Sequence, residues 1–269
     1  MFEKHKEIKD GLMSLMSENR EYIDTTHNIL RSIHESYINK HSDYYSANEL
    51  QWINHFLDTV IYKSFLVSIA VEQLQSVKFG KIDESLWQAI DNSINKLDCS
   101  NDENILLSFA LESFLFEARS FLDVYMIFIC LLLKTGFTNG HMSKEKFYAE
   151  LRKVHEPPFL EKAKYTQNYF KKRVFGTINQ KNLAPIRDDW GSLLISLRDK
   201  IAHRDKLNLS FNSTEKISFN ILLNFPSIND LTYQLFAETL RNGIHALFYD
   251  VLAHIYEEKW DDFQKQINK

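Results

Sequence analysis

The spacing of apolar residues along the chain predicts a series of helices. Over residues 47–78 apolar side chains recur every three or four positions, which is typical of one face of a single long helix. A second long helix is expected over residues 101–134. Because this second segment is apolar nearly all round, we expect it to lie at the centre of a helical bundle.

Shorter helices are predicted after these two. Ser143 opens a helical segment that runs to His155, and Pro157 lies where the next helix would have its first turn, a position that tolerates proline. Another helix is expected over residues 186–204, with an apolar stripe that should face the core. A final helix is expected to begin near Pro226.

One segment shows the alternation of a strand pair. Residues 207–211 and 217–221 alternate apolar and polar side chains on either side of the polar run 212–216, which predicts a β-hairpin with its turn in that run. Only 7 Gly and 4 Pro occur in 269 residues, too few for a turn-rich sandwich or barrel. The fold class expected is therefore all-α, an up-down helical bundle with a small hairpin inserted after the helix over 186–204.

Composition limits the remaining possibilities. No low-complexity linker interrupts the chain, so residues 47–269 are interpreted as one helical domain and residues 1–46 as an N-terminal helical extension. With 32 basic and 36 acidic side chains the formal net charge is −4, which excludes a globally basic nucleic-acid coat but leaves room for a local basic cleft. The longest apolar run, residues 124–133, is well short of the ~20 residues that cross a bilayer. We expect a cytoplasmic protein without a membrane segment.

Neither the cysteines nor the histidines form a metal-binding pattern. Cys99 and Cys130 are 31 residues apart and belong to no Cys/His cluster, so two reduced, buried thiols are expected. His27, His34 and His41 are spaced by seven, about 10.5 Å apart along a helix, which is too far to share one ion. A solvated histidine stripe is the preferred interpretation, and no metal or cofactor is expected.

Two groups of charged residues could serve structure or function. Arg119 and Asp123, four residues apart in the most apolar helix near Glu117, are expected to form a structural ion pair in preference to a site. The most basic part of the chain, residues 162–173, mixes cations with aromatic residues in a way that suits nucleic acid, although a solvated helix face is the commoner explanation. The RNA-binding candidates within it are Lys164, Lys171, Lys172 and Arg173.

The most informative segment runs from Arg198 to His203. On a helical wheel these two residues flank the outward face and are separated by about 140°. A histidine can move a proton to or from a ribose hydroxyl or a leaving oxygen, and a guanidinium binds phosphate oxygens in a fork. This chemistry suits metal-independent cleavage of RNA. The alternative is a charged, exposed helix end with no site.

The segment also resembles the motif of the HEPN superfamily, in which an Arg is followed by a polar residue and, a few positions later, by a His. Asp199 occupies the polar place, and Ala202 precedes His203 as it often does in that family. The similarity covers about ten residues in motif and roughly residues 48–260 in expected architecture.

The resemblance implies a helical bundle that dimerises through the motif helix and cleaves RNA to leave 2′,3′-cyclic phosphate ends. Arg198 and His203 would be catalytic, Asp199 would orient the Arg, and Lys200 and Arg204 would contact RNA. Such proteins are common as toxins and antiviral effectors, with an antitoxin or sensor protein as a further partner. Because many family members are inactive, a non-catalytic module that binds nucleotide, RNA or protein remains the alternative function.

Overall fold

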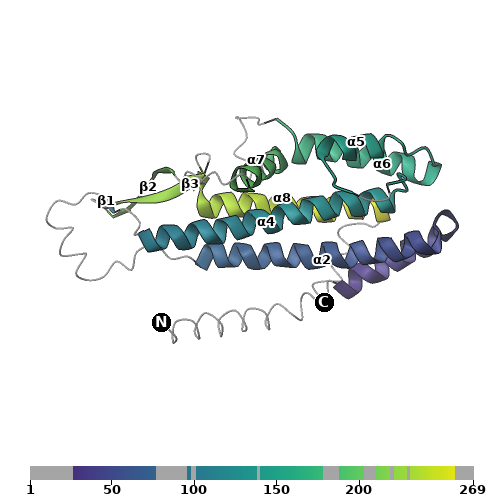
Figure 1. Cartoon of the computed structure of the whole chain (residues 1–269), viewed down its shortest axis with the longest axis horizontal. Helices are drawn as coiled ribbons and strands as arrows, with labels where there is room; N and C mark the ends of the chain where they lie inside the picture. Colours follow the sequence, from purple (N-terminus) through teal and green to yellow (C-terminus); the bar gives the residue numbers. More distant parts are fainter. Residues whose placement is uncertain are drawn as a thin grey trace. The chain divides into compact units, whose positions relative to one another are not determined.

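The computed structural model of the chain describes residues 27–76, 96–97, 101–137, 140–177, 188–202, 210–218, 221–228 and 231–257. These residues are mostly helical, as the hydrophobic pattern predicts (Figure 1). The chain divides into two compact units, Met1–His55 with Tyr249–Lys269, and Phe56–Phe248. In chain order the elements are a helix over residues 27–40, the 3-10 turn η1 (Ser42–Tyr44), α2 (Ala47–Ser76), β1 (Lys96–Leu97), α4 (Asn101–Leu132), α5 (Lys144–Leu151), α6 (Pro157–Tyr169), the π-helical segment η2 (Phe170–Val174), α7 (Trp190–Ala202), β2 (Ser210–Ser218), β3 (Ile221–Ile228), β4 (Leu231–Thr232) and α8 (Tyr233–Tyr256).

Helix α4 is the core of the larger unit, as predicted. Between Leu107 and Leu122 it buries one broad stripe, whereas from Tyr125 to Leu132 most side chains are buried. The Tyr125 hydroxyl reaches α8 and lies 3.1 Å from the Leu247 carbonyl oxygen and 3.2 Å from that of Phe248. Figure 1 shows α4 and α8 running side by side. The buried residues of α4 are Leu107, Ala110, Leu111, Phe114, Leu115, Ala118, Arg119, Phe121, Leu122, Tyr125, Met126, Phe128, Ile129, Cys130 and Leu132.

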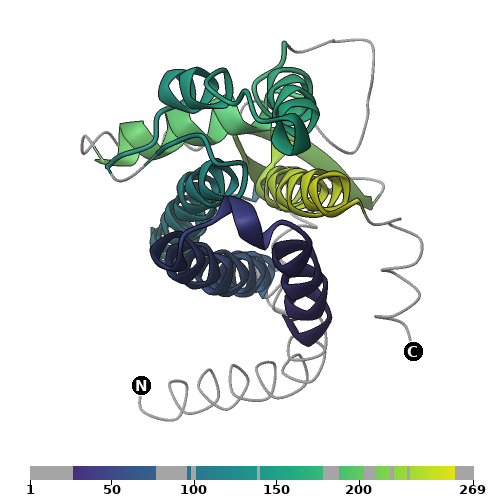
Figure 2. The ribbon, with the colours of Figure 1, turned by 90° about the vertical axis from the view of Figure 1, so that its right-hand side faces the viewer.

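Helices α5 and α6 begin next to the predicted openings at Ser143 and Pro157. The Ser143 hydroxyl accepts a hydrogen bond from the Lys146 backbone N–H at 3.2 Å, which satisfies one of the free donors of the first turn. Pro157 occupies the first turn of α6. In Figure 2 both helices lie on one side of the α4 and α8 pair.

Two glycines let the first turn of α7 pack closely against its neighbours. A Cβ at Gly243 of α8 would lie 2.7 Å from the indole ring of Trp190, so this ring rests directly on the α8 backbone. A Cβ at Gly191 would lie 2.5 Å from Val174 in η2. Helix α7 therefore begins between η2 and α8. It starts at Trp190, whereas residues 178–187, which include the predicted start at Ile186, lie outside the described part.

The strands form a small sheet in the order β1-β3-β2, with β4 paired to β3. Strands β2 and β3 pair antiparallel, and the Ser218 to Ile221 pair is next to the chain reversal. The turn predicted over residues 212–216 is therefore misplaced, because residues 213–216 pair with residues 222–225. The predicted helix start at Pro226 is also wrong: this residue belongs to β3, and α8 begins at Tyr233.

The histidine stripe of the smaller unit is not solvated. His34 and His41 are buried, which contradicts the prediction. The two ring nitrogens of His34 lie 2.9 Å from the Tyr256 hydroxyl and 3.0 Å from the Asn54 side-chain oxygen. The face is covered by a residue 222 positions away, which no helical wheel can reveal. His27 keeps its expected place near solvent, and its ring accepts a hydrogen bond from Arg31.

Cys130 is a buried free thiol, as expected, and burial raises its pKa to about 12. Cys99 lies outside the described residues. Among the residues that the structure describes, no group of His, Cys, Asp or Glu is arranged to hold a metal ion. Within the same ranges, no helix combines the length and apolarity needed to span a membrane.

Candidate functional site

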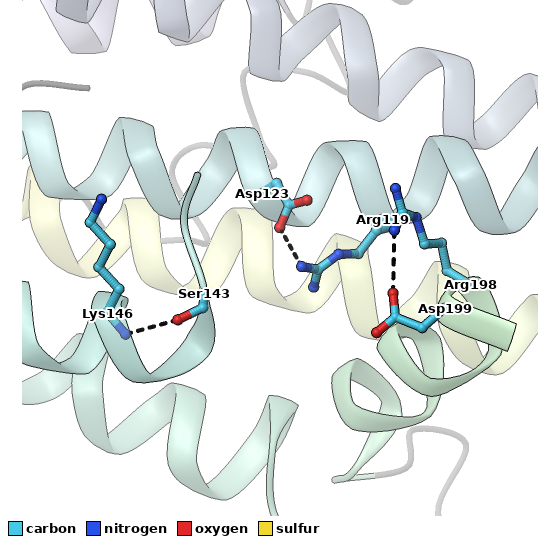
Figure 3. A network of polar contacts seen from close by, with 6 residues as sticks. All are labelled: Arg119, Asp123, Ser143, Lys146, Arg198 and Asp199. Atoms are coloured by element: carbon cyan, nitrogen blue, oxygen red, sulfur yellow. Dashed lines mark hydrogen bonds and ion pairs between the residues drawn. The ribbon is translucent and has the colours of Figure 1, made fainter. Parts of the chain in front are cut away.

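The core-facing stripe of α7 orients the motif helix. Its predicted members Trp190, Leu193, Leu194 and Leu197 are all buried, whereas Asp199 is exposed. Arg198 follows the last of these buried residues and lies at the border between the packed face and solvent. Helix α7 packs on α4, so the Arg198 side chain is directed along that contact (Figure 3).

Arg198 is held by one contact from each helix. Its guanidinium carbon lies 5.6 Å from the centre of the Phe116 ring on α4, within the range of a cation–π interaction. Its Nη1 donates a hydrogen bond of 3.3 Å to the Asp199 carboxylate. The Arg198 side chain remains 38% exposed. A guanidinium that is held on two sides and exposed on the third can bind an anion from solvent.

The ion pair predicted between Arg119 and Asp123 is confirmed. Nη2 of Arg119 lies 2.9 Å from Oδ1 of Asp123, and the Arg119 side chain is only 10% exposed. Glu117, which the sequence places in the same cluster, instead pairs with Lys63 of α2 at 2.9 Å. The sequence does not reveal that the Arg119–Asp123 pair lies beside the motif helix, as Figure 3 shows.

Four charged residues thus gather at the contact between α4 and α7, and we refer to Arg119, Asp123, Arg198 and Asp199 as the α4–α7 cluster. Burial raises the pKa of Asp123, and the positive charges of Arg119, His141 and Arg198 oppose that rise, while the Asp199 charge adds to it. All four of these neighbours therefore act on one carboxyl group. The contribution of His141, in the loop before α5, is a feature that sequence reasoning missed.

The two guanidinium groups of the cluster are incompletely satisfied. Nη1 of Arg119 and Nε of Arg198 are buried, and neither has a hydrogen-bond partner in the part of the chain that the structure describes. A buried donor without an acceptor costs on the order of 1–3 kcal/mol. Such a cost is removed when an acceptor oxygen enters the site.

The other predicted residues of the motif lie at or beyond the end of α7. Lys200 is exposed in its last turn. His203 and Arg204 lie outside the described residues, so their distance from Arg198 is not part of the structure.

Only part of the basic segment, residues 162–173, lies near α7. Lys164 pairs with Glu161 at 2.7 Å, and Arg173 pairs with Asp188 at 3.1 Å. Lys171 and Lys172 are exposed in η2, and the Lys171 ammonium lies 5.6 Å from the centre of the Tyr148 ring.

The position of η2 relates this basic segment to Arg198. Val174 at the end of η2 lies against Gly191 in the first turn of α7. Arg198 is seven positions after Gly191, about 10 Å along the helix axis. Lys162, also in the basic segment, is buried, so a fully solvated face is not what the structure contains.

Comparison of the chain with protein-family models, with curated proteins and with solved structures found no match.

Proposed function

We propose that the chain is a metal-independent endoribonuclease of HEPN type that acts as a cytoplasmic toxin or antiviral effector. The observation that carries the proposal is the setting of Arg198, which is fixed by Phe116 and Asp199 at the edge of the α4–α7 contact and remains open to solvent on its third side. In this proposal the helices form a HEPN-type bundle, and the β2–β3 pair is an insertion after the motif helix.

The proposed reaction needs only groups of the motif. The ribose 2′-hydroxyl loses its proton and its oxygen attacks phosphorus, while the bond from phosphorus to the 5′ oxygen breaks and that oxygen gains a proton. His203 moves these protons, since imidazole titrates near neutral pH. Arg198 binds the phosphate oxygens as negative charge accumulates on them, and Asp199 orients Arg198. The products are a 2′,3′-cyclic phosphate and a 5′-hydroxyl.

A homodimer completes the proposed site. Two α7 helices related by a two-fold axis would bring two Arg198 and two His203 side chains into one cleft. Lys200 and Arg204 would contact RNA at its rim, and the exposed cations of η2 would extend the contact along the strand. An antitoxin or sensor protein is the further partner that this function requires for control.

The test is cleavage of RNA in excess chelator, under conditions that release any bound inhibitor. Wild-type protein should produce cyclic phosphate ends. His203→Ala and Arg198→Ala should each lose at least about 100-fold in rate, the usual contribution of a proton-transferring or oxyanion-binding group. Arg152→Ala, which removes an exposed guanidinium at the end of α5, is the matched control and should cut normally. If His203→Ala cuts as fast as wild type, the catalytic assignment is wrong.

The charge balance of the cluster favours a second candidate function. Arg198 faces Asp199 and Arg119 faces Asp123, so each guanidinium already has one carboxylate. Such balance is compatible with a non-catalytic module that holds nucleotide, RNA or a protein partner. That function predicts that Arg198→Ala weakens ligand retention or dimerisation, whereas RNA incubated with the wild-type protein keeps its original ends.

A further inference from the structure

Positive charge is concentrated in residues 140–177, which contain α5, α6 and η2. This segment has nine Lys and Arg against four Asp and Glu, although the whole chain has 32 against 36. Of its four acids, Glu150 pairs with Lys153 at 2.6 Å. Glu161 pairs with Lys164 at 2.7 Å. The excess of positive charge is therefore confined to one part of a protein that is acidic as a whole.

Three lysines of this segment have no acidic partner in the part of the chain that the structure describes. They are Lys144, the first residue of α5, and Lys171 and Lys172 in η2, and we refer to them as the α5–η2 lysines. Both lysines of η2 are exposed, and Lys144 is half-buried. The neighbouring Arg173 differs, because it pairs with Asp188 at 3.1 Å. The charge of the α5–η2 lysines can therefore act on an anion that approaches from solvent.

Two aromatic rings connect these lysines across the contact between α5 and η2. The Lys144 ammonium lies 4.9 Å from the centre of the Phe175 ring, which follows η2. The Lys171 ammonium lies 5.6 Å from the centre of the Tyr148 ring on α5. The two ring centres are 6.4 Å apart. The two ammonium groups are therefore at most about 17 Å apart, the sum of these three distances.

The π-helical form of η2 presents its cations to solvent as one group. Phe170 and Val174, the first and last residues of η2, are both fully buried, whereas the three residues between them are exposed. The Phe170 ring packs on Phe147 of α5, with ring centres 4.6 Å apart, which fixes the side of η2 that faces inward. π-helical turns are rare, and they are frequent at functional sites.

The surface around the α5–η2 lysines offers charge without apolar area. The large hydrophobic side chains that are exposed in the described part of the chain all lie outside residues 140–177. A protein interface has an apolar core, and a helix that lies on a membrane buries an apolar face. A nucleic-acid backbone requires neither, because its phosphates attract cations whatever the bases are. Since phosphates repeat at about 3.4 Å along one strand of a helix, roughly five of them span the distance between the lysines.

We propose that the α5–η2 lysines form a sequence-independent docking surface for the phosphate backbone of RNA. The inference deepens the proposed function and rests on it for the identity of the nucleic acid as RNA. Because η2 contacts the first turn of α7 through Val174 and Gly191, a strand docked here lies next to the helix that carries Arg198. Lys144 is the member that the basic segment of the sequence does not include, since it comes from α5.

The test measures binding of a short single-stranded 2′-O-methyl RNA by fluorescence anisotropy at several salt concentrations. This probe has no 2′-hydroxyl, so binding is measured independently of cleavage. Replacing all three α5–η2 lysines by Gln should weaken binding at least about 10-fold at low salt. The slope of log K against log salt should become shallower by about 2, since each phosphate contact on a single strand contributes about 0.7. Two probes of unrelated base sequence should lose affinity equally, because no exposed ring in this segment can stack on a base.

Single substitutions separate the surface from net charge. Lys144→Gln alone should weaken binding about 3-fold. Lys40→Gln is the matched control, because it also removes one exposed cation, but one that already pairs with Glu257, and it should bind within about 1.5-fold of wild type. Burial raises the pKa of Tyr148 and the charge of Glu145 adds to the rise, so this carboxylate lies near the surface and Glu145→Gln should tighten binding. Arg at all three lysine positions should preserve binding, and circular dichroism establishes that each variant is folded.

Two outcomes overturn the inference. One is a triple Gln variant that binds the probe with the affinity and salt slope of wild type. The other is a wild-type protein whose α5–η2 lysines bind a polyglutamate peptide or phosphatidylserine vesicles more tightly than RNA. If natural RNA is never cleaved but the anisotropy results are as expected, the proposed nuclease fails and the docking surface stands. If wild type cleaves RNA and the triple variant binds as wild type does, the nuclease stands and this inference fails.

Discussion

Replacing Gly243 of α8 by Ala tests how the motif helix is positioned. An added Cβ would lie 2.7 Å from Cδ1 and Nε1 of the Trp190 ring and 2.8 Å from Cγ. Carbon atoms pack best at about 3.5–4.0 Å, so the ring or the helix must move by roughly 1 Å. Overpacking of this kind costs about 1–3 kcal/mol. The higher helix propensity of Ala offsets about 0.8–1.0 kcal/mol of that cost.

We therefore expect Gly243→Ala to lower the free energy of unfolding by about 1 kcal/mol, the difference between these two effects. Urea unfolding followed by circular dichroism measures it, with the slope of the transition unchanged. In a Trp190→Ala background the ring atoms that the methyl group would meet are absent. There the same substitution should be neutral or stabilising, and the coupling between the two sites should exceed about 0.5 kcal/mol.

The result that would refute this reasoning is a Gly243→Ala protein that is more stable than wild type by about 1 kcal/mol, the value for helix propensity alone. The Trp190 ring would then not rest on the α8 backbone, and the described position of α7 would be incorrect. Since α7 carries Arg198, a shift of α7 in this variant should also slow the proposed cleavage of RNA.

Three further predictions concern single groups. Tyr125→Phe should lower the free energy of unfolding by about 1 kcal/mol, because the Tyr125 hydroxyl donates a hydrogen bond to α8. Tyr148→Phe should be neutral or stabilising, because the Tyr148 hydroxyl is buried without a partner among the described residues. Chemical denaturation of both variants measures the difference. Ser143→Ala should cost about 1 kcal/mol through loss of the α5 cap, and Ser143→Thr much less, as measured by thermal unfolding. Burial raises the pKa of Cys130 from 9.0 to about 12, so the thiol stays protonated to a higher pH in the folded state than in the unfolded state. The free energy of unfolding should therefore fall as the pH rises from 9 towards 12. This decrease should be smaller in Cys130→Ala. If the free energy of unfolding falls equally with pH in both proteins, the raised pKa of Cys130 is wrong.

Long periodic segments were predictable because burial of a helix face leaves a regular trace in sequence. Helix α2 begins at the predicted Ala47, and α4 begins at Asn101, one of the two residues, Asn101 and Asp102, at which its start was predicted. The helix starts at Ser143 and Pro157 were also predicted from local sequence. These features depend on neighbours within one or two turns, so a single segment contains the information.

The errors arise where distant segments meet. The wheel of residues 27–41 could not show that Tyr256 covers His34. The polar run over residues 212–216 has the composition of a turn but pairs with β3, since composition does not specify register. The Arg119–Asp123 pair was predicted from its spacing, whereas its place beside Arg198 depends on how α7 packs on α4. The sequence therefore predicted the members of the candidate site on each helix but not that the two helices bring them together.

The contact between His34 and Tyr256 also has a consequence for how the protein is made. The ribosome must add 222 residues after His34 before Tyr256 can meet it, and the pair of Lys40 with Glu257 forms at the same late stage. The segment over residues 27–55 must therefore wait, incompletely folded, while the unit of residues 56–248 is synthesised and packs. Translation that stops shortly before Tyr249 would release a chain whose first helices never find their covering partner.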